Sequence, residues 1–212
     1  MTITHHPSDP TLAGLAAGTL CEGRALVVAT HLATCQSCRK SVRSFERLRG
    51  IALEDSKPLP LAASALQHAL QAIGSDEPLQ PPPGRDRDQS EWPAPLSSYP
   101  LGAWRWIGRG VQWRVAGVPA EQGTRVFMLK AAPGTRIPAH EHDGIEWTCV
   151  LQGAFRHQLG RYGAGDFDEA DDTVEHQPVV EDGVECICLV ALQGQIRLKG
   201  WMGRLIQPFM QI

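Results

Sequence analysis

Two groups of metal-binding residue types, far apart in the chain and chemically different, constrain what this sequence can fold into. The first group combines imidazole with thiol side chains: His31, Cys35 and Cys38, with the histidine pair His5 and His6 upstream. The second combines imidazole with a carboxylate: His140, His142, Glu146 and His176. Sulfur and imidazole together suit structural zinc, whereas three imidazoles and a carboxylate suit zinc, iron, manganese or nickel. One site of each kind predicts two domains.

The bulk composition agrees with a folded protein of that size. The chain has 212 residues, of which 42% are hydrophobic and 20% charged, enough for one small and one medium domain. A formal net charge of −3 argues against nucleic acid as a direct partner. The local basic run in residues 39–49 is interpreted as a solvated helix face, with an acidic protein partner as the alternative.

No targeting segment is expected. The first 20 residues contain no lysine or arginine, and no window reaches the roughly 18 consecutive apolar residues of a membrane helix. We therefore expect a cytoplasmic protein without membrane contact. The six cysteines are then expected to be reduced or metal-bound, not paired in disulfides.

Residues 8–73 have helical periodicity. Ser8 and Asp9 are N-cap residue types, and Pro10 suits a first helical turn. The pattern predicts three helices: one that begins near residue 9 and keeps helical spacing as far as Leu20, weakened by Gly18 near its end, one over 22–33 and one over 35–53. The prolines at 58 and 60 interrupt it, and a fourth helix is predicted over 61–73.

The rest of the chain divides into a linker and a β region. Prolines and charges dominate residues 76–95, which predicts a flexible Pro-rich linker between a domain at 1–75 and one at 96–212. From Leu96 onward, short alternating runs separated by glycines predict an all-β sandwich or barrel.

The spacing of the first group suits one tetrahedral ion. Cys35 and Cys38 form a compact CxxC clamp, and His31 lies one helical turn earlier. His6 or His5 would supply the fourth ligand, and His6 is preferred. The alternatives are a redox CxxC pair or two incidental core cysteines. The redox role is disfavoured because no βαβ pattern surrounds the motif.

The His31-x-x-x-Cys35-x-x-Cys38 pattern with an upstream histidine resembles the zinc-binding anti-sigma factors over residues 1–75. The resemblance implies a partner, an extracytoplasmic-function sigma factor. It also implies that the fourth helix packs between two domains of that partner. The apolar stripe Leu66, Leu70 and Ile73 is compatible with such a contact, and packing within the chain is the alternative.

The second group matches the first cupin motif. Gly134, His140, His142, Glu146 and Gly153 occupy the expected positions. Two histidines two apart on a strand point to the same face, and Glu146 is expected on the return strand after a turn.

The second cupin motif is degenerate. Gly165-Asp166 opens it and His176 closes it, but Asp171 and Thr173 replace the expected proline and glycine. His176 is still predicted as a ligand. The four ligands suit either a closed zinc site or a metal with open positions.

Several residues outside these motifs have simple interpretations. Cys186 and Cys188 lie on one face of a predicted strand, as small buried apolar residues or as oxidation-sensitive thiols near the second metal. His5, His68 and His157 are expected on the surface.

A zinc helical domain followed by a cupin resembles the ChrR-type anti-sigma factors. The resemblance implies a cytoplasmic, non-enzymatic regulator with one zinc ion per domain, the second replaceable by another divalent metal. Such a protein inhibits its sigma factor and releases it under oxidative stress such as singlet oxygen, with the cupin domain required for the response. The alternative is a metal-dependent cupin dioxygenase or isomerase with an accessory zinc domain. A DNA-binding regulator is disfavoured because the sequence lacks a clear basic recognition surface.

Overall fold

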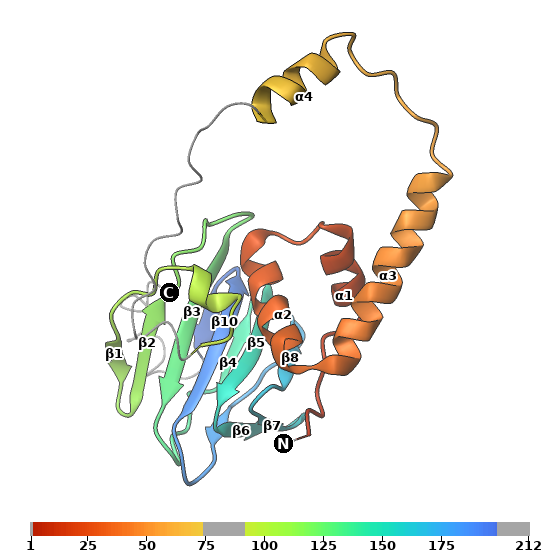
Figure 1. Cartoon of the computed structure of the whole chain (residues 1–212). Coiled ribbons are helices and arrows are strands. Elements are labelled where there is room, and N and C mark those ends of the chain that lie inside the picture. The colour runs from red at the N-terminus through yellow and green to blue at the C-terminus, as the bar shows by residue number, and fades with distance from the viewer. Residues whose placement is uncertain (1, 74–91, 199–212) are drawn as a thin grey trace.

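A computed structural model describes residues 2–73 and 92–198 of the chain. Helices form the N-terminal part and antiparallel strands form the C-terminal part (Figure 1). The helices are α1 (Asp9–Ala17), α2 (Glu22–Thr34), α3 (Gln36–Glu54) and α4 (Ala65–Ile73). This division confirms the helical and β halves that the periodicity predicts.

Helix α1 begins where its N-cap signal predicts, but it ends before Leu20, which the apolar spacing had included. The Ser8 hydroxyl accepts a hydrogen bond from the Thr11 N–H at 3.4 Å, and Pro10 lies in the first turn. Gly18 ends the helix with a φ of +66°, a left-handed conformation that favours glycine.

Helix α4 begins later than predicted. Residues 61–64 are not helical, because the chain makes a turn in which the Ala65 N–H bonds the Ala62 carbonyl at 2.9 Å. Ser64 precedes the helix, and its carbonyl accepts from His68 at 3.0 Å. Serine is a favoured N-cap residue, so this boundary had a local signal that the apolar periodicity alone missed.

The C-terminal part starts with the short 3₁₀ helix η2 (Leu96–Ser98), where the sequence had suggested only β structure. The strands are β1 (Arg105–Gly108), β2 (Val111–Val115), β3 (Thr124–Ala131), β4 (His140–His142), β5 (Ile145–Gln152), β6 (Ala154–His157), β7 (Gly160–Gly163), β8 (Phe167–Ala170), β9 (Val179–Val180), β10 (Cys186–Gln193) and β11 (Ile196–Leu198).

The strands pair into three separate sheets. The largest has the order β1-β2-β3-β10-β5-β8, and the smaller ones are β11-β4 and β7-β6-β9. Within the described residues, strand pairing does not close these sheets into one barrel, which corrects the prediction of a barrel. The alternating pattern detects strands, but closure depends on which strand edges meet in space.

Strand β10 lies at the centre of the large sheet and is covered on both faces. Leu189 and Ala191 face a core shared with the helices, whereas Cys188 and Val190 face the interior between the sheets. Two-sided burial explains why this strand is a nearly continuous apolar run.

Helix α2 packs directly on the large sheet. A Cβ built on Gly23 would lie 2.7 Å from Cγ2 of Val126, so the helix approaches β3 at a position without a side chain. Leu26 and Val27 of the helix share one buried cluster with Leu189 of the sheet. The helical and β parts therefore have a common apolar core (Figure 1).

The predicted linker falls mainly outside the described residues, since its positions 76–91 are not among them. Its last residues lead into folded structure. The Arg114 guanidinium lies 5.3 Å from the Trp92 ring centroid and 4.4 Å from that of Trp104, and Leu96 is fully buried.

Among the described residues, no single helix has the length and apolar character needed to cross a membrane. The pair α1 and α2, bent by 113°, meets both criteria only when its two helices are taken together.

Candidate metal sites

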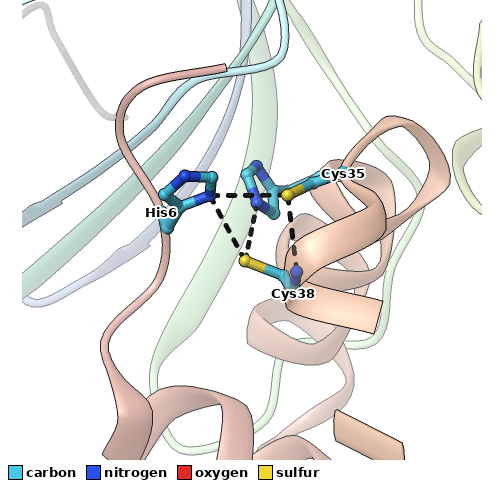
Figure 2. Close-up of side chains that lie close together, drawn as sticks. His6, Cys35 and Cys38 are labelled. Atoms are coloured by element: carbon cyan, nitrogen blue, oxygen red, sulfur yellow. Dashed lines mark hydrogen bonds between the residues drawn. The ribbon is translucent and has the colours of Figure 1, made fainter. Parts of the chain in front are cut away.

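The first predicted group converges at one point. One donor atom from each of His6, His31, Cys35 and Cys38 lies within 4.8 Å of the other three. His31 comes from the end of α2, Cys35 from the junction between the helices and Cys38 from the first turn of α3. His6 reaches the cluster from the extended N-terminal segment and is the exposed member (Figure 2).

The distances within this cluster fit a tetrahedral zinc ion. Nε2 of His31 lies 3.3 Å from Sγ of Cys38, and Nδ1 of His6 lies 3.4 Å from each cysteine sulfur. Ligands bound at zinc–nitrogen and zinc–sulfur distances of about 2.0 and 2.3 Å would be about 3.3–3.8 Å apart. The donor set and its spacing therefore fit zinc.

The electrostatics of the cluster also favour a cation. Burial lowers the pKa of His31 to about 4, so its ring is neutral and able to ligate. Burial would raise the pKa of Cys35, but hydrogen bonds from Ser37 and Cys38 outweigh it and lower that pKa. Burial and the adjacent Cys35 raise the pKa of Cys38 to about 12. Without a cation, Cys38 therefore stays protonated beside Cys35. A divalent metal would supply the positive charge that lets both sulfurs ionise and ligate.

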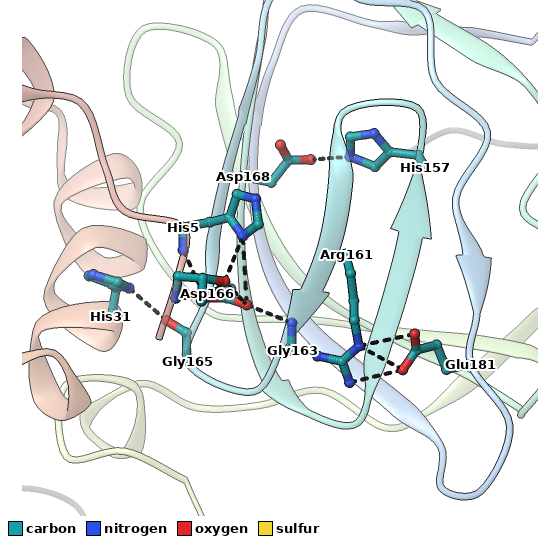
Figure 3. Close-up of polar contacts among 10 residues, drawn as sticks. His5, His31, His157, Arg161, Gly163, Gly165, Asp166, Asp168 and Glu181 are labelled. Carbon is teal, nitrogen blue, oxygen red and sulfur yellow. Dashed lines mark hydrogen bonds and ion pairs between the residues drawn. The ribbon is translucent and has the colours of Figure 1, made fainter. Parts of the chain in front are cut away.

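His31 has an outer partner that the sequence did not indicate. Its Nδ1 lies 2.7 Å from the carbonyl oxygen of Gly165, which precedes β8 (Figure 3). A carbonyl can only accept, so we assign the ring proton to Nδ1, which leaves Nε2 unprotonated toward Cys38. The two residues are 134 positions apart, beyond the range of local spacing.

The second predicted group also converges. One donor atom from each of His140, His142, Glu146 and His176 lies within 4.8 Å of the other three. Strand β4 carries both His140 and His142, and Glu146 lies on β5. His176 is held beside β4 by two backbone hydrogen bonds of 3.1 Å with His140.

The imidazoles of this group face one another through their ligating nitrogens. Nε2 of His176 lies 2.9 Å from Nε2 of His140 and 3.2 Å from that of His142. His140 places Nδ1 at 2.8 Å from the Pro138 carbonyl, so its Nε2 is the unprotonated nitrogen. Burial lowers the pKa of His176 to about 3. Neutral imidazoles with converging lone pairs fit a divalent metal.

A cavity of about 390 Å³ adjoins this second group. Its lining is largely apolar and includes His140, Glu146 and His176. Cys186 and Cys188 also line it, with their sulfurs 3.7 Å apart. The hydrogen bond with Cys186, followed by burial, raises the pKa of Cys188. Both cysteines are thus buried thiols that face the interior near the second group.

The prediction that His157 is a surface residue is wrong. Its side chain is fully buried, and its Nε2 lies 3.2 Å from Oδ2 of Asp168 (Figure 3). Its ring centroid is 5.2 Å from that of His176, so it borders the second group. Phe155, two residues earlier on β6, is buried on the same face, and this alternation was a signal for an interior histidine.

The prediction that His5 is a surface residue is also wrong in part. Its ring is half-buried, packs on Tyr162 with centroids 4.2 Å apart and lies 3.8 Å from the Asp166 carboxylate. His6, and not His5, joins the first cluster. His68 on α4 is exposed, as predicted.

The β part, with its metal-ligand cluster, is a cupin-like domain. Residues 102–196 match the family described as the ChrR cupin-like domain. The class of protein that combines such a domain with an N-terminal His/Cys cluster is the anti-sigma factor.

This chain belongs to the ChrR family of anti-sigma factors. It is 38% identical to the anti-sigma-E factor ChrR of Cereibacter sphaeroides over 218 aligned positions, which span 100% of both chains. It is also similar to the crystal structure of Rhodobacter sphaeroides SigE in complex with the anti-sigma ChrR. That match has a TM-score of 0.77 and 37% identity, and covers 91% of this chain and 100% of the other.

Family membership decides between the two functional classes considered from the sequence. Anti-sigma factors are regulators, so the chain is not an enzyme of the dioxygenase or isomerase type. The cupin-like domain therefore serves a regulatory protein.

Proposed function

We propose that this protein binds an extracytoplasmic-function sigma factor through its helical part and inhibits it. The observation that carries the proposal is the full-length similarity to ChrR, combined with the structural match to a chain that is in complex with SigE. Because a sigma factor acts on RNA polymerase, we also propose a cytoplasmic location.

The proposed zinc of the first site would be held by His6, His31, Cys35 and Cys38. It would join the N-terminal segment to the junction of α2 and α3, so that the binding face is ordered before the partner arrives. His140, His142, Glu146 and His176 would hold a second zinc or another divalent metal. The converging donor atoms of both clusters support these assignments.

Exposed apolar residues on the helices supply a surface for the partner. Leu66, Leu70 and Ile73 form the stripe on α4 and are 72%, 60% and 80% exposed. Leu48 and Leu53 on α3 are also exposed. Residues of this kind are costly in water and suit a groove on another protein. Their exposure supports an intermolecular role over packing within the chain.

We propose that the cupin-like domain senses oxidative stress such as singlet oxygen and is required for sigma release. An oxidative change that requires the intact second metal site would shift the population toward a state with lower sigma affinity. The domain division stays part of this proposal: 1–75 as the anti-sigma domain, 76–95 as the segment that links the two domains and 96–212 as the cupin-like domain.

The proposal is tested by removing the first site. Cys35→Ala combined with Cys38→Ala should lose one bound metal per chain, because two of four ligands are gone. It should also lose pull-down of an extracytoplasmic-function sigma factor and inhibition of transcription in vitro. Metal analysis and the two assays are made on the same preparation.

The matched control is Cys186→Ala combined with Cys188→Ala. It makes the same chemical change at two buried cysteines far from the first cluster and should leave sigma binding intact. Full inhibition by the Cys35/Cys38 variant would refute the proposed role of the first site.

A further inference from the structure

The turn that connects β7 to β8 lies against the N-terminal segment that carries His6. The Phe167 N–H donates to the His5 carbonyl at 3.1 Å, which adds this segment to the start of β8. The Asp166 carboxylate accepts from the backbone N–H groups of Thr4 at 2.7 Å and His5 at 2.9 Å (Figure 3). These contacts immediately precede the ligand His6 in the chain.

The Asp166 carboxylate is buried and accepts hydrogen bonds through both oxygens. It is 3% exposed, and its second carboxylate oxygen accepts from the Gly163 N–H at 2.8 Å. Burial would raise its pKa, but the hydrogen bonds from Gly163, His5 and Thr4 outweigh it and lower the pKa. A buried, ionised carboxylate that three backbone N–H groups surround holds all three strongly.

The same turn reaches the other imidazole ligand of the first site. The Gly165 carbonyl orients His31, as described above. This turn packs closely against the N-terminal segment, because a Cβ on Gly165 would lie 2.9 Å from Cδ1 of Ile3. Gly165 also has a φ of +93°, which favours glycine. One turn of the cupin-like domain thus contacts the surroundings of both His6 and His31.

His6 has little local support of its own. It is exposed, and it lies in a segment that forms neither helix nor strand. Helix geometry fixes His31, Cys35 and Cys38 relative to one another. The position of His6 depends instead on contacts made by its neighbours, and most of those are to Asp166 and Phe167.

We propose that Asp166 is a positioning residue for the first metal site, so that the cupin-like domain helps to set how tightly the anti-sigma domain holds its metal. The inference rests on the proposed metal site. It assigns to a residue of one domain a role in the coordination chemistry of the other.

The test measures metal affinity in the full-length chain. Co²⁺ is titrated against a chelator, and thiolate-to-cobalt absorption reports the first site, because the second donor cluster contains no cysteine. Asp166→Ala should weaken Co²⁺ binding at the first site by up to about 10-fold, the lower end of the effect of losing a direct outer-shell partner, because Asp166 holds the residues before His6 and not a ligand itself. Asp166→Asn, which keeps one acceptor oxygen, should recover part of that loss.

The control is Asp171→Ala, which makes the same substitution in the same domain. Its carboxylate accepts from the N–H and the hydroxyl of Thr173, in a turn of its own. Parental affinity in Asp166→Ala, or an equal loss in Asp171→Ala, would overturn the inference. If Asp166→Ala does not fold, the Co²⁺ affinity of Asp166→Asn is measured instead. A lower affinity than the parent's supports the inference, and an unchanged affinity overturns it.

The parent protein separates this inference from the proposal on which it rests. Absence of thiolate-to-cobalt absorption in the parent would refute the first metal site itself. Normal absorption in the parent with no effect at Asp166 would refute only the positioning role.

Discussion

Burial, together with nearby acidic groups, keeps both tyrosines of this protein protonated to high pH. Burial, followed by a 2.8 Å hydrogen bond from the Tyr99 hydroxyl to Glu22, raises the pKa of Tyr99 to about 12. Burial, followed by the charge of Asp168, raises the pKa of Tyr162 still further. The folded chain therefore prefers both tyrosines protonated.

This preference predicts an unusual alkaline titration. Absorbance at 295 nm should show little tyrosinate in the folded protein near pH 10, where free tyrosine is about half ionised. The unfolded chain loses these protons first, so their stabilising effect is complete below pH about 10 and declines as the pH rises toward 12.

Circular dichroism follows folding in the same samples, and Tyr99→Phe isolates Tyr162. Ionisation of both tyrosines near pH 10, with the helical signal unchanged, would show that their surroundings do not act as described.

At the scale of elements, the junction between α2 and the large sheet depends on a residue with no side chain. Gly23 allows the helix to approach Val126 of β3, and the buried cluster of Leu26, Val27 and Leu189 forms beside it. Glycine is unfavourable inside a helix, so its presence here indicates that close packing outweighs helix propensity.

We predict opposite effects for two Gly→Ala substitutions in helices. Gly50→Ala on α3 should raise the free energy of unfolding by about 1 kcal/mol, because its Cβ would meet open space and alanine favours a helix. Gly23→Ala gains little propensity, because Gly23 lies in the first turn of α2, and it overpacks the junction at a cost of about 1–3 kcal/mol. Denaturant unfolding of the metal-loaded protein should therefore give a higher free energy of unfolding for Gly50→Ala than for the parent, and a lower one for Gly23→Ala. Equal shifts would show that the junction adapts without cost.

At the scale of the whole molecule, the two clusters of candidate metal ligands lie in parts of the chain that share one apolar core. The segment 163–168 contacts residues next to both clusters. Asp166 holds the residues before His6, and Asp168 holds His157 beside His176. Contacts made by one short segment therefore connect the second cluster to the first. If these contacts carry the proposed signal, loading the second site with metal changes the metal affinity of the first site, and the reverse change is equal.

We predict that His140→Ala combined with His142→Ala leaves sigma binding within about threefold of the parent, because the first cluster and the helical surface stay intact. The variant should fail to release sigma when cells are exposed to singlet oxygen, since the proposed sensor has lost two ligands. Reporter transcription and co-purification of sigma measure the two properties.

The control is Glu141→Gln, which lies between the two histidines on β4, where successive side chains point to opposite faces. It should behave as the parent in both assays. Constitutive release of sigma by the histidine variant would mean that the second site also holds the inhibitory state together.

The amino-acid sequence by itself determined the features that depend on short-range spacing. The N-cap at Ser8 marked the start of α1, and the i, i+2 spacing of His140 and His142 placed both on one face of β4. Local spacing grouped most of the candidate metal ligands. The need for a fourth tetrahedral ligand added His6, and the second cupin motif added His176. Local backbone geometry is fixed by a few residues, so it can be read without a fold.

Only the tertiary structure decided the features that join distant segments. The bond from His31 to Gly165, the hold of Asp166 on Thr4 and His5, and the burial of His157 against Asp168 all depend on which surfaces pack together. The three separate sheets and the core shared by helices and strands have the same origin. Sequence periodicity predicts that a side chain is buried. Which residue it contacts depends on how whole helices and strands pack together, and no local pattern specifies that packing.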